Sequence, residues 1–136
     1  MTRRQVYLAG PPHAEEYRSR AAELVRARGW EPIDPMRRDF RGRTQGSEAE
    51  IVEGDLADIR SCAAVLADFT RPDEGTAMEV WYAREQGIPV VAYTGGTPPH
   101  PWTVYVADEV CADLRSAVAA LNSRAPADRP PSRAAE

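Results

Sequence analysis

The chain has 136 residues, which is enough for one hydrophobic core and too few for two domains. Its formal net charge of −4 gives no electrostatic basis for binding polymeric nucleic acid. The two cysteines form no metal-binding motif, and no apolar run approaches the ~20 residues of a membrane helix. The N-terminus has no signal-peptide core. We therefore expect a cytoplasmic protein without metal, cofactor or membrane anchor.

Strand and helix signals alternate along the sequence. Short apolar runs predict strands at residues 6–9, 30–33, 63–67, 90–93 and 104–110. Apolar residues at helical spacing predict helices at about 14–28, 47–60, 75–86 and 112–121, the second beginning with a capping box of Ser47 and Glu50. From Asn122 onward large apolar residues are almost absent, so we expect one domain over 1–123 and a disordered tail over 124–136.

This alternation predicts an α/β fold, a single-domain doubly wound (Rossmann-like or flavodoxin-like) parallel sheet of about five strands with helices on both faces. Ligands of such sheets bind outside the carboxyl ends of the strands. The loops that follow the predicted strands are therefore the places to search, at residues 10–13, 35–46, 68–75 and 94–101.

The densest candidate chemistry lies in residues 68–79, where a strand end leads through a loop into a helix. Glu79 is surrounded in sequence by apolar residues, so its helix is expected to be buried. Because burial of an unpaired carboxylate is costly, Glu79 is expected either to pair with another residue or to act on a ligand. Gly75 and Ala83 leave space on its face for a ligand, and the positive helix N-terminus is expected to keep Glu79 ionised, as a nucleophile requires. Spacing alone leaves a buried ion pair or a helix cap as an equal alternative.

Three aspartates accompany Glu79. From the sequence alone Asp73 is interpreted as a cap or turn residue, Asp55 as a helix carboxylate at the core edge, and Asp68 as a sheet-end carboxylate that ties down a loop. Two carboxylates across one small pocket would permit glycosyl transfer, because one attacks the anomeric carbon while the other exchanges a proton with the leaving group. A nucleobase leaves much more readily once protonated, so the pairing suits an N-glycoside.

The sequence resembles the nucleoside 2-deoxyribosyltransferases and the related nucleoside 5′-monophosphate N-glycosidases over roughly residues 4–121. The matching segments are Val-Tyr-Leu-Ala-Gly-Pro at 6–11, Asp-Leu-Ala-Asp-Ile-Arg-Ser-Cys at 55–62, Asp-Glu-Gly-Thr-Ala-Met-Glu-Val-Trp-Tyr-Ala at 73–83 and Gly-Ile-Pro-Val-Val at 87–91. The Gly-Thr-Ala-Met-Glu segment is fairly specific when a strand and an aspartate precede it, whereas the first segment is weak by itself.

The resemblance implies roles for four residues. Glu79 matches the nucleophile that forms a covalent glycosyl intermediate, Asp73 the acid/base at the leaving base, and Asp55 a second carboxylate that holds the base. Tyr7 matches a tyrosine that orients the nucleophile. Further candidate substrate contacts are Gly10, Pro11, Asp68, Gly75 and Met78. The family also implies a homodimer or higher homo-oligomer with shared active sites.

The sequence departs from the family pattern in two places. The transferases supply an asparagine before the last helix to a neighbouring subunit's site, but residues 100–105 contain none, which leaves sugar recognition open. His100 and Trp102 in this region are candidate ligand contacts, with surface exposure or packing as the alternatives. The loop at 37–43 contains four arginines, of which Arg41 and Arg43 are candidate 5′-phosphate contacts. A solvated surface loop is the alternative.

We therefore expect an enzyme that cleaves the N-glycosidic bond of a nucleoside or nucleotide through Glu79 and transfers the 2-deoxyribosyl group to a free nucleobase. One alternative is a nucleoside 5′-monophosphate N-glycosidase with water as the acceptor, and another is a nucleotide-binding module without turnover. A dinucleotide-binding protein is disfavoured because no Gly-x-Gly-x-x-Gly follows the first strand.

Overall fold

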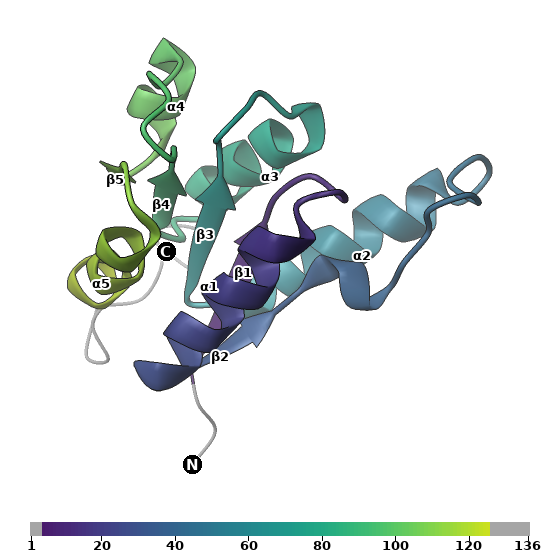
Figure 1. Cartoon of the computed structure of the whole chain (residues 1–136). Helices are drawn as coiled ribbons and strands as arrows, with labels where there is room; N and C mark the ends of the chain where they lie inside the picture. The colour runs from purple at the N-terminus through teal and green to yellow at the C-terminus, as the bar shows by residue number, and fades with distance from the viewer. Residues whose placement is uncertain (1–3, 126–136) are drawn as a thin grey trace.

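The structure is a computed structural model, which describes residues 4–125. Five parallel strands form one sheet in the order β2-β1-β3-β4-β5 (Figure 1). The strands are β1 (Arg4–Ala9), β2 (Trp30–Ile33), β3 (Ala64–Asp68), β4 (Val90–Tyr93) and β5 (Glu109–Cys111). The helices are α1 (Glu15–Ala27), η1 (Pro35–Arg37, a 3-10 helix), α2 (Glu48–Ser61), α3 (Glu74–Glu85), α4 (Pro101–Val106) and α5 (Leu114–Arg124). The predicted α/β fold class is confirmed.

The sheet separates two hydrophobic cores, because successive side chains of a strand point to opposite faces. In β1, Val6 and Leu8 pack with residues of α1 and α5, whereas Tyr7 and Ala9 pack with residues of α2 and α3. Figure 1 shows the same layering, with α1 and α5 on one face of the sheet and α2 and α3 on the other. The strand alternation thus directs Tyr7 toward the helix that carries Glu79.

The strand order places a topological switch point between β1 and β3. The chain runs from β1 through α1 to the edge strand β2, then crosses back through α2 to β3 on the other side of β1. The loops after β1 and β3 therefore lead to helices on opposite faces of the sheet, which opens a crevice at the carboxyl ends of these strands. Within residues 4–125 no helix is long and apolar enough to cross a membrane.

The prediction of a fifth strand at 104–110 was wrong in its position. Residues 101–106 form α4, and only Glu109–Cys111 pair with β4. Pro101 is well placed at the first helical position, and the His100 side chain caps the helix by accepting a hydrogen bond from the Trp102 N–H. Thr103 and Val106, three residues apart, are buried, so helical packing outweighs the strand preference of the β-branched residues.

Two further expectations need correction. The sequence predicts a tail from Asn122 and over 124–136, but α5 continues to Arg124 with Ala125 as its C-cap, and the Trp30 indole N–H donates to Asn122 Oδ1 at 2.7 Å. The rest of that tail, residues 126–136, lies outside the described residues. Ser47 precedes α2 as predicted but makes no side-chain cap bond, and the Glu48 carboxylate instead accepts from the Gly46 N–H.

Candidate active site

A pocket of about 320 Å³ lies at the carboxyl edge of the sheet, between the β1–α1 loop, the β2–α2 loop, α2 and the start of α3. This volume falls within the range of small-molecule sites, about 300–1,000 Å³. Three of the four loops selected from the sequence contribute to its lining, and the loop at 94–101 does not. Asp55, Asp73 and Glu79 all line the pocket, so the fold brings together the three carboxylates that the family resemblance implies.

Glu79 lies in the second turn of α3, a helix that packs against β1. Tyr7 is fully buried in the middle of the sheet, and its hydroxyl donates a hydrogen bond to Glu79 Oε2. Burial and the neighbouring Glu79 raise the pKa of Tyr7 far above its ordinary value, so the phenol remains a donor at every physiological pH. The contact fixes one oxygen of the candidate nucleophile.

The pKa of Glu79 is raised to about 8, mainly by burial and further by Asp55 and Asp73, while the Tyr7 hydrogen bond opposes the rise. The expectation that the helix N-terminus keeps this carboxylate ionised is therefore wrong. Glu79 is the sixth residue of α3, and the influence of a helix dipole falls off within the first turn. Desolvation and two nearby acids outweigh it.

Asp73 is the N-cap of α3 and also faces the pocket. Its Oδ2 accepts hydrogen bonds from the Thr76 N–H at 3.0 Å and the Thr76 hydroxyl at 2.6 Å. The interpretation of Asp73 as a helix cap is confirmed, and its place in the pocket lining leaves the acid/base role available as well. Thr76, which lines the pocket, was not among the predicted site residues. Its position three residues after the cap is the signal that identifies it.

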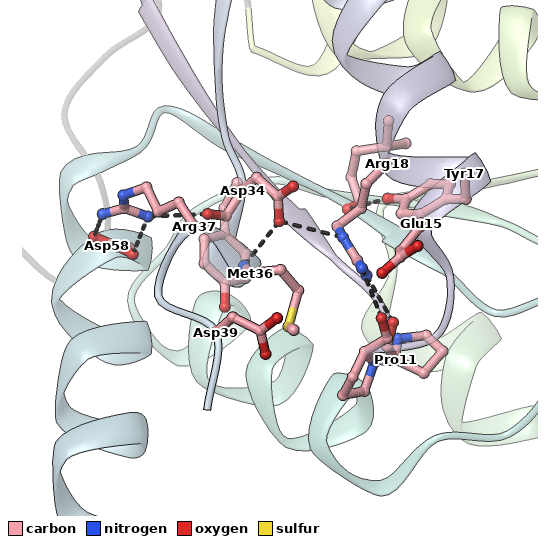
Figure 2. Close-up of polar contacts among 12 residues, drawn as sticks. Pro11, Glu15, Tyr17, Arg18, Asp34, Met36, Arg37, Asp39 and Asp58 are labelled. Atoms are coloured by element: carbon pink, nitrogen blue, oxygen red, sulfur yellow. Dashed lines mark hydrogen bonds and ion pairs between the residues drawn. The ribbon is translucent and has the colours of Figure 1, made fainter. Parts of the chain in front are cut away.

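Asp55 and Asp58, on α2, are held by two arginines of the β2–α2 loop. Arg37 makes a bidentate contact with Asp58, at 2.8 Å to each oxygen (Figure 2). Arg38 Nη2 lies 2.9 Å from Asp58 Oδ2 and 3.2 Å from Asp55 Oδ1. Burial raises the pKa of Asp55 although Arg38 opposes the rise, whereas the two arginines outweigh burial and lower the pKa of Asp58.

Arg38 lines the pocket but was not predicted as a site residue. Its guanidinium packs on Gly54, where an added Cβ would lie 3.0–3.1 Å from three guanidinium atoms. A residue without a side chain one position before Asp55 therefore makes room for the arginine that contacts Asp55. The arginine-rich loop and the glycine are both visible in the sequence, but their proximity depends on the fold.

The other two arginines of the loop, Arg41 and Arg43, also contact neighbouring side chains. Arg41 lines the pocket, and its guanidinium contacts Asp39 at 2.6 Å and Glu15 at 2.7 Å. Arg43 is not part of the lining. Its guanidinium lies 4.4 Å from the ring centroid of Phe40, which does line the pocket. The four arginines thus neutralise carboxylates or cover an aromatic ring.

Of the other predicted contacts, Gly10, Gly75 and Met78 line the Glu79 pocket, whereas five do not. Asp68 is buried and accepts from the Thr70 N–H at 2.9 Å, which confirms its interpretation as a loop anchor. The residues outside the lining are Pro11, Asp68, Arg43, His100 and Trp102. Trp102 is exposed on α4, with its ring centroid 6.2 Å from that of Trp81.

A doubly wound sheet with three carboxylates and a tyrosine gathered at its switch point defines an α/β enzyme whose site suits transfer or hydrolysis of a glycoside. The sequence model of the nucleoside 2-deoxyribosyltransferase family matches residues 6–122, and the chain belongs to this family. Family membership makes the protein a nucleoside deoxyribosyltransferase or N-glycosidase. No curated protein sequence matches the chain significantly.

Solved structures share the fold at low sequence identity. A 2-deoxyribosyltransferase from Bacillus psychrosaccharolyticus superposes with a TM-score of 0.70 and 20% identity, covering 82% of this chain and 88% of that one. A CMP N-glycosidase from Clostridium botulinum gives 0.59 and 16%, covering 88% and 98%. An orphan response regulator of H. pylori gives 0.53 and 16%, covering 89% and 95%, so this fold alone does not determine function.

Proposed function

We propose that this protein cleaves the N-glycosidic bond of a nucleoside through a covalent intermediate on Glu79 and transfers the 2-deoxyribosyl group to a second nucleobase. The observation that carries the proposal is the contact between the Tyr7 hydroxyl and Glu79 in a pocket that also contains Asp55 and Asp73. A buried carboxylate oriented by a neutral donor, with other acids beside it, has the composition that a double displacement at an anomeric carbon needs.

In the first step an ionised Glu79 oxygen bonds to C1′ as the C1′–N bond breaks. The bonding electron pair leaves with the base, and the base nitrogen takes the proton of Asp73. In the second step a nitrogen of the incoming base bonds to C1′, the ester bond breaks, and its electron pair returns to Glu79. Asp73 then takes the proton that the incoming nitrogen releases, so the enzyme is regenerated.

The charges around the pocket favour a nucleoside over a 5′-monophosphate. Arg38 and Arg41 are the two loop arginines in the lining, and both already contact carboxylates. A phosphate dianion would have to displace these partners and also approach the acidic side chains of Asp55 and Asp73, which costs Coulomb energy in a partly buried site. An uncharged sugar hydroxyl meets neither obstacle.

A second copy of the chain is the partner that we propose for the apolar surface formed by Met78 and Trp81 of α3 and Trp102 and Tyr105 of α4. These side chains are between 42% and 69% exposed. Contiguous exposed apolar surface marks interaction sites, and Met78 also lines the pocket, so a copy docked here would border the site.

The two cysteines are free thiols, which suits a reducing cytoplasm.

Incubation with all common nucleosides and their 5′-monophosphates, with and without a second free base, tests the reaction. Transfer predicts a new nucleoside only when the second base is present, and Glu79→Ala should abolish it while nucleoside binding remains. Free base released without an acceptor would identify a hydrolase instead. A preference for monophosphates would contradict the charge argument, and binding without any turnover would identify a binding module.

Sedimentation velocity tests the proposed partner. The wild-type protein should sediment as a dimer or larger, and Trp102→Arg should shift it toward the monomer. A wild-type protein that stays monomeric at high concentration would contradict the assignment of this surface to a second copy.

A further inference from the structure

Arg18 is a buried arginine beside the pocket that the proposed chemistry does not use. It lies in the first turn of α1, and only 3% of the residue is exposed. A buried charge is costly unless it is paired and hydrogen-bonded, so its partners explain why the fold keeps it. Within residues 4–125 no buried side-chain nitrogen or oxygen lacks a hydrogen-bond partner, and Arg18 follows that pattern.

The guanidinium of Arg18 contacts two different loops (Figure 2). On the β1–α1 loop, Nη1 donates to the Pro11 carbonyl at 2.6 Å and Nη2 donates to the Pro12 carbonyl at 2.8 Å. On the segment after β2, Nε lies 3.2 Å from Asp34 Oδ1. Only a guanidinium offers these donors in one fixed plane, so a lysine cannot replace the full set.

Both of these loops form walls of the pocket. Gly10 and Pro12 line it from the β1–α1 loop, and Pro35 and Met36 line it from η1. Asp34 Oδ1 also accepts a hydrogen bond from the Met36 N–H at 2.8 Å. One aspartate oxygen therefore joins the arginine to the first turn of η1.

The same segment is also tied to α2. Arg37 donates to the Asp34 carbonyl at 3.2 Å and makes its bidentate contact with Asp58 (Figure 2). The contacts thus run from the β1–α1 loop through Arg18 and η1 to the helix that carries Asp55. Tyr7 in β1 and Glu79 in α3 stand outside this chain of contacts, because neither makes a bond with Arg18 or Asp34.

We propose that Arg18 is a positioning residue that holds the β1–α1 and β2–α2 loops at a fixed separation and thereby sets the affinity of the pocket for its nucleoside. The inference rests on the proposed function and identifies the element that shapes its binding walls. Because Arg18 does not hold Tyr7 or Glu79, its loss weakens binding in the ground state and transition state alike. The expected signature is a higher KM with kcat nearly unchanged.

Arg18→Met keeps the length of the side chain and removes its donors, and Arg20→Met is the matched control on an exposed position of the same helix. We expect Arg18→Met to raise KM, and the Kd of a nucleoside measured by equilibrium binding, about tenfold or more. Arg20→Met should leave both constants unchanged. A merely destabilised protein would behave differently, since a smaller folded fraction lowers the apparent kcat at constant KM.

Chemical rescue and a variant of Asp34 examine the contacts of the Arg18 guanidinium separately. Millimolar guanidinium should restore the KM of Arg18→Ala, while urea at the same concentration should not. Asp34→Asn removes the carboxylate from the arginine but keeps an oxygen for the Met36 N–H, so it should raise KM by a smaller factor and stay folded if the Arg18 variants do not.

Amide hydrogen exchange without any substrate separates this inference from the proposed function. Residues 10–14 and 34–38 should both exchange faster in Arg18→Met or, if that variant does not fold, in Asp34→Asn. A wild-type protein that neither binds nor converts a nucleoside would refute the proposed function only. Unchanged exchange in both loops, or a wild-type KM in a folded Arg18→Met protein, would overturn the role of Arg18.

Discussion

Replacing Glu79 by glutamine should make the fold more stable at alkaline pH. The pKa of Glu79 is raised from 4.5 to about 8 by burial and the nearby acids. In the unfolded chain the carboxyl group ionises near its ordinary value, whereas in the folded protein it holds its proton to much higher pH. The wild-type fold is therefore favoured below pH 4.5 and loses this contribution as the pH rises through 8. Glutamine keeps the shape and cannot ionise.

The size of the effect follows from the shift. Each pKa unit corresponds to about 1.4 kcal/mol, so the complete shift is an upper limit of roughly 4–5 kcal/mol. Relaxation of the pocket and entry of water reduce this figure. We expect the difference in unfolding free energy between Glu79→Gln and the wild type to grow by about 2–3 kcal/mol between pH 5 and pH 9.

Urea unfolding of both proteins at a series of pH values measures the difference. Glu85→Gln is the matched control, because it removes an exposed carboxylate from the same helix and should show no pH-dependent gap. A constant difference between Glu79→Gln and the wild type over this range would refute the argument that burial and neighbouring acids hold Glu79 protonated. Activity plays no part in this assay, so the result does not depend on the substrate.

Three other changes have definite expected outcomes. Attack requires ionised Glu79 and base release requires protonated Asp73, so kcat/KM should show a bell-shaped pH profile. Tyr7→Phe should move the limb that reports Glu79 to higher pH, because the Tyr7 hydrogen bond lowers the pKa of Glu79. An unmoved profile would contradict this contact. Asp73→Asn should keep the helix cap and the stability of the fold but lose base release. Asp73→Ala should have an unfolding free energy about 1 kcal/mol lower than that of Asp73→Asn, measured by urea unfolding. Equal stabilities of the two variants would contradict the capping geometry. Asn122→Ala should lower the unfolding free energy by about 1–2 kcal/mol, because it leaves the Trp30 indole N–H without its acceptor, and an unchanged midpoint would argue against that bond.

Most of the fold could be predicted because its signals are local. The strands at 30–33 and 90–93 have the predicted bounds, and the first four predicted strands and the helices between them are present. The error at 104–110 arose where β-branched residues occur in a helix that is held by tertiary packing and by a histidine cap. Neither influence can be recognised from strand propensity.

The acidic residues of the candidate site could be predicted from the sequence, whereas the protonation of Glu79 and the ion pairs of the arginines could not. The family segments placed Asp55, Asp73 and Glu79, and the structure brings them into one pocket. The protonation of Glu79 depends on three-dimensional burial, which no local pattern reports. The same holds for the arginines: four cations in one loop suggested a phosphate, whereas the aspartates of α2, distant in the sequence, meet two of them in the fold.

Helix α3 has a different neighbour on each of its sides. Val80 and Ala83 pack in the core, Glu79 faces the pocket, and Met78 and Trp81 are exposed beside α4. Because Met78 lies on this exposed side and also lines the pocket of Glu79, a second copy docked here would cover one wall of the site. If copies of the chain pair over that side, specific activity becomes a function of protein concentration, and dilution alone would act as an inhibitor.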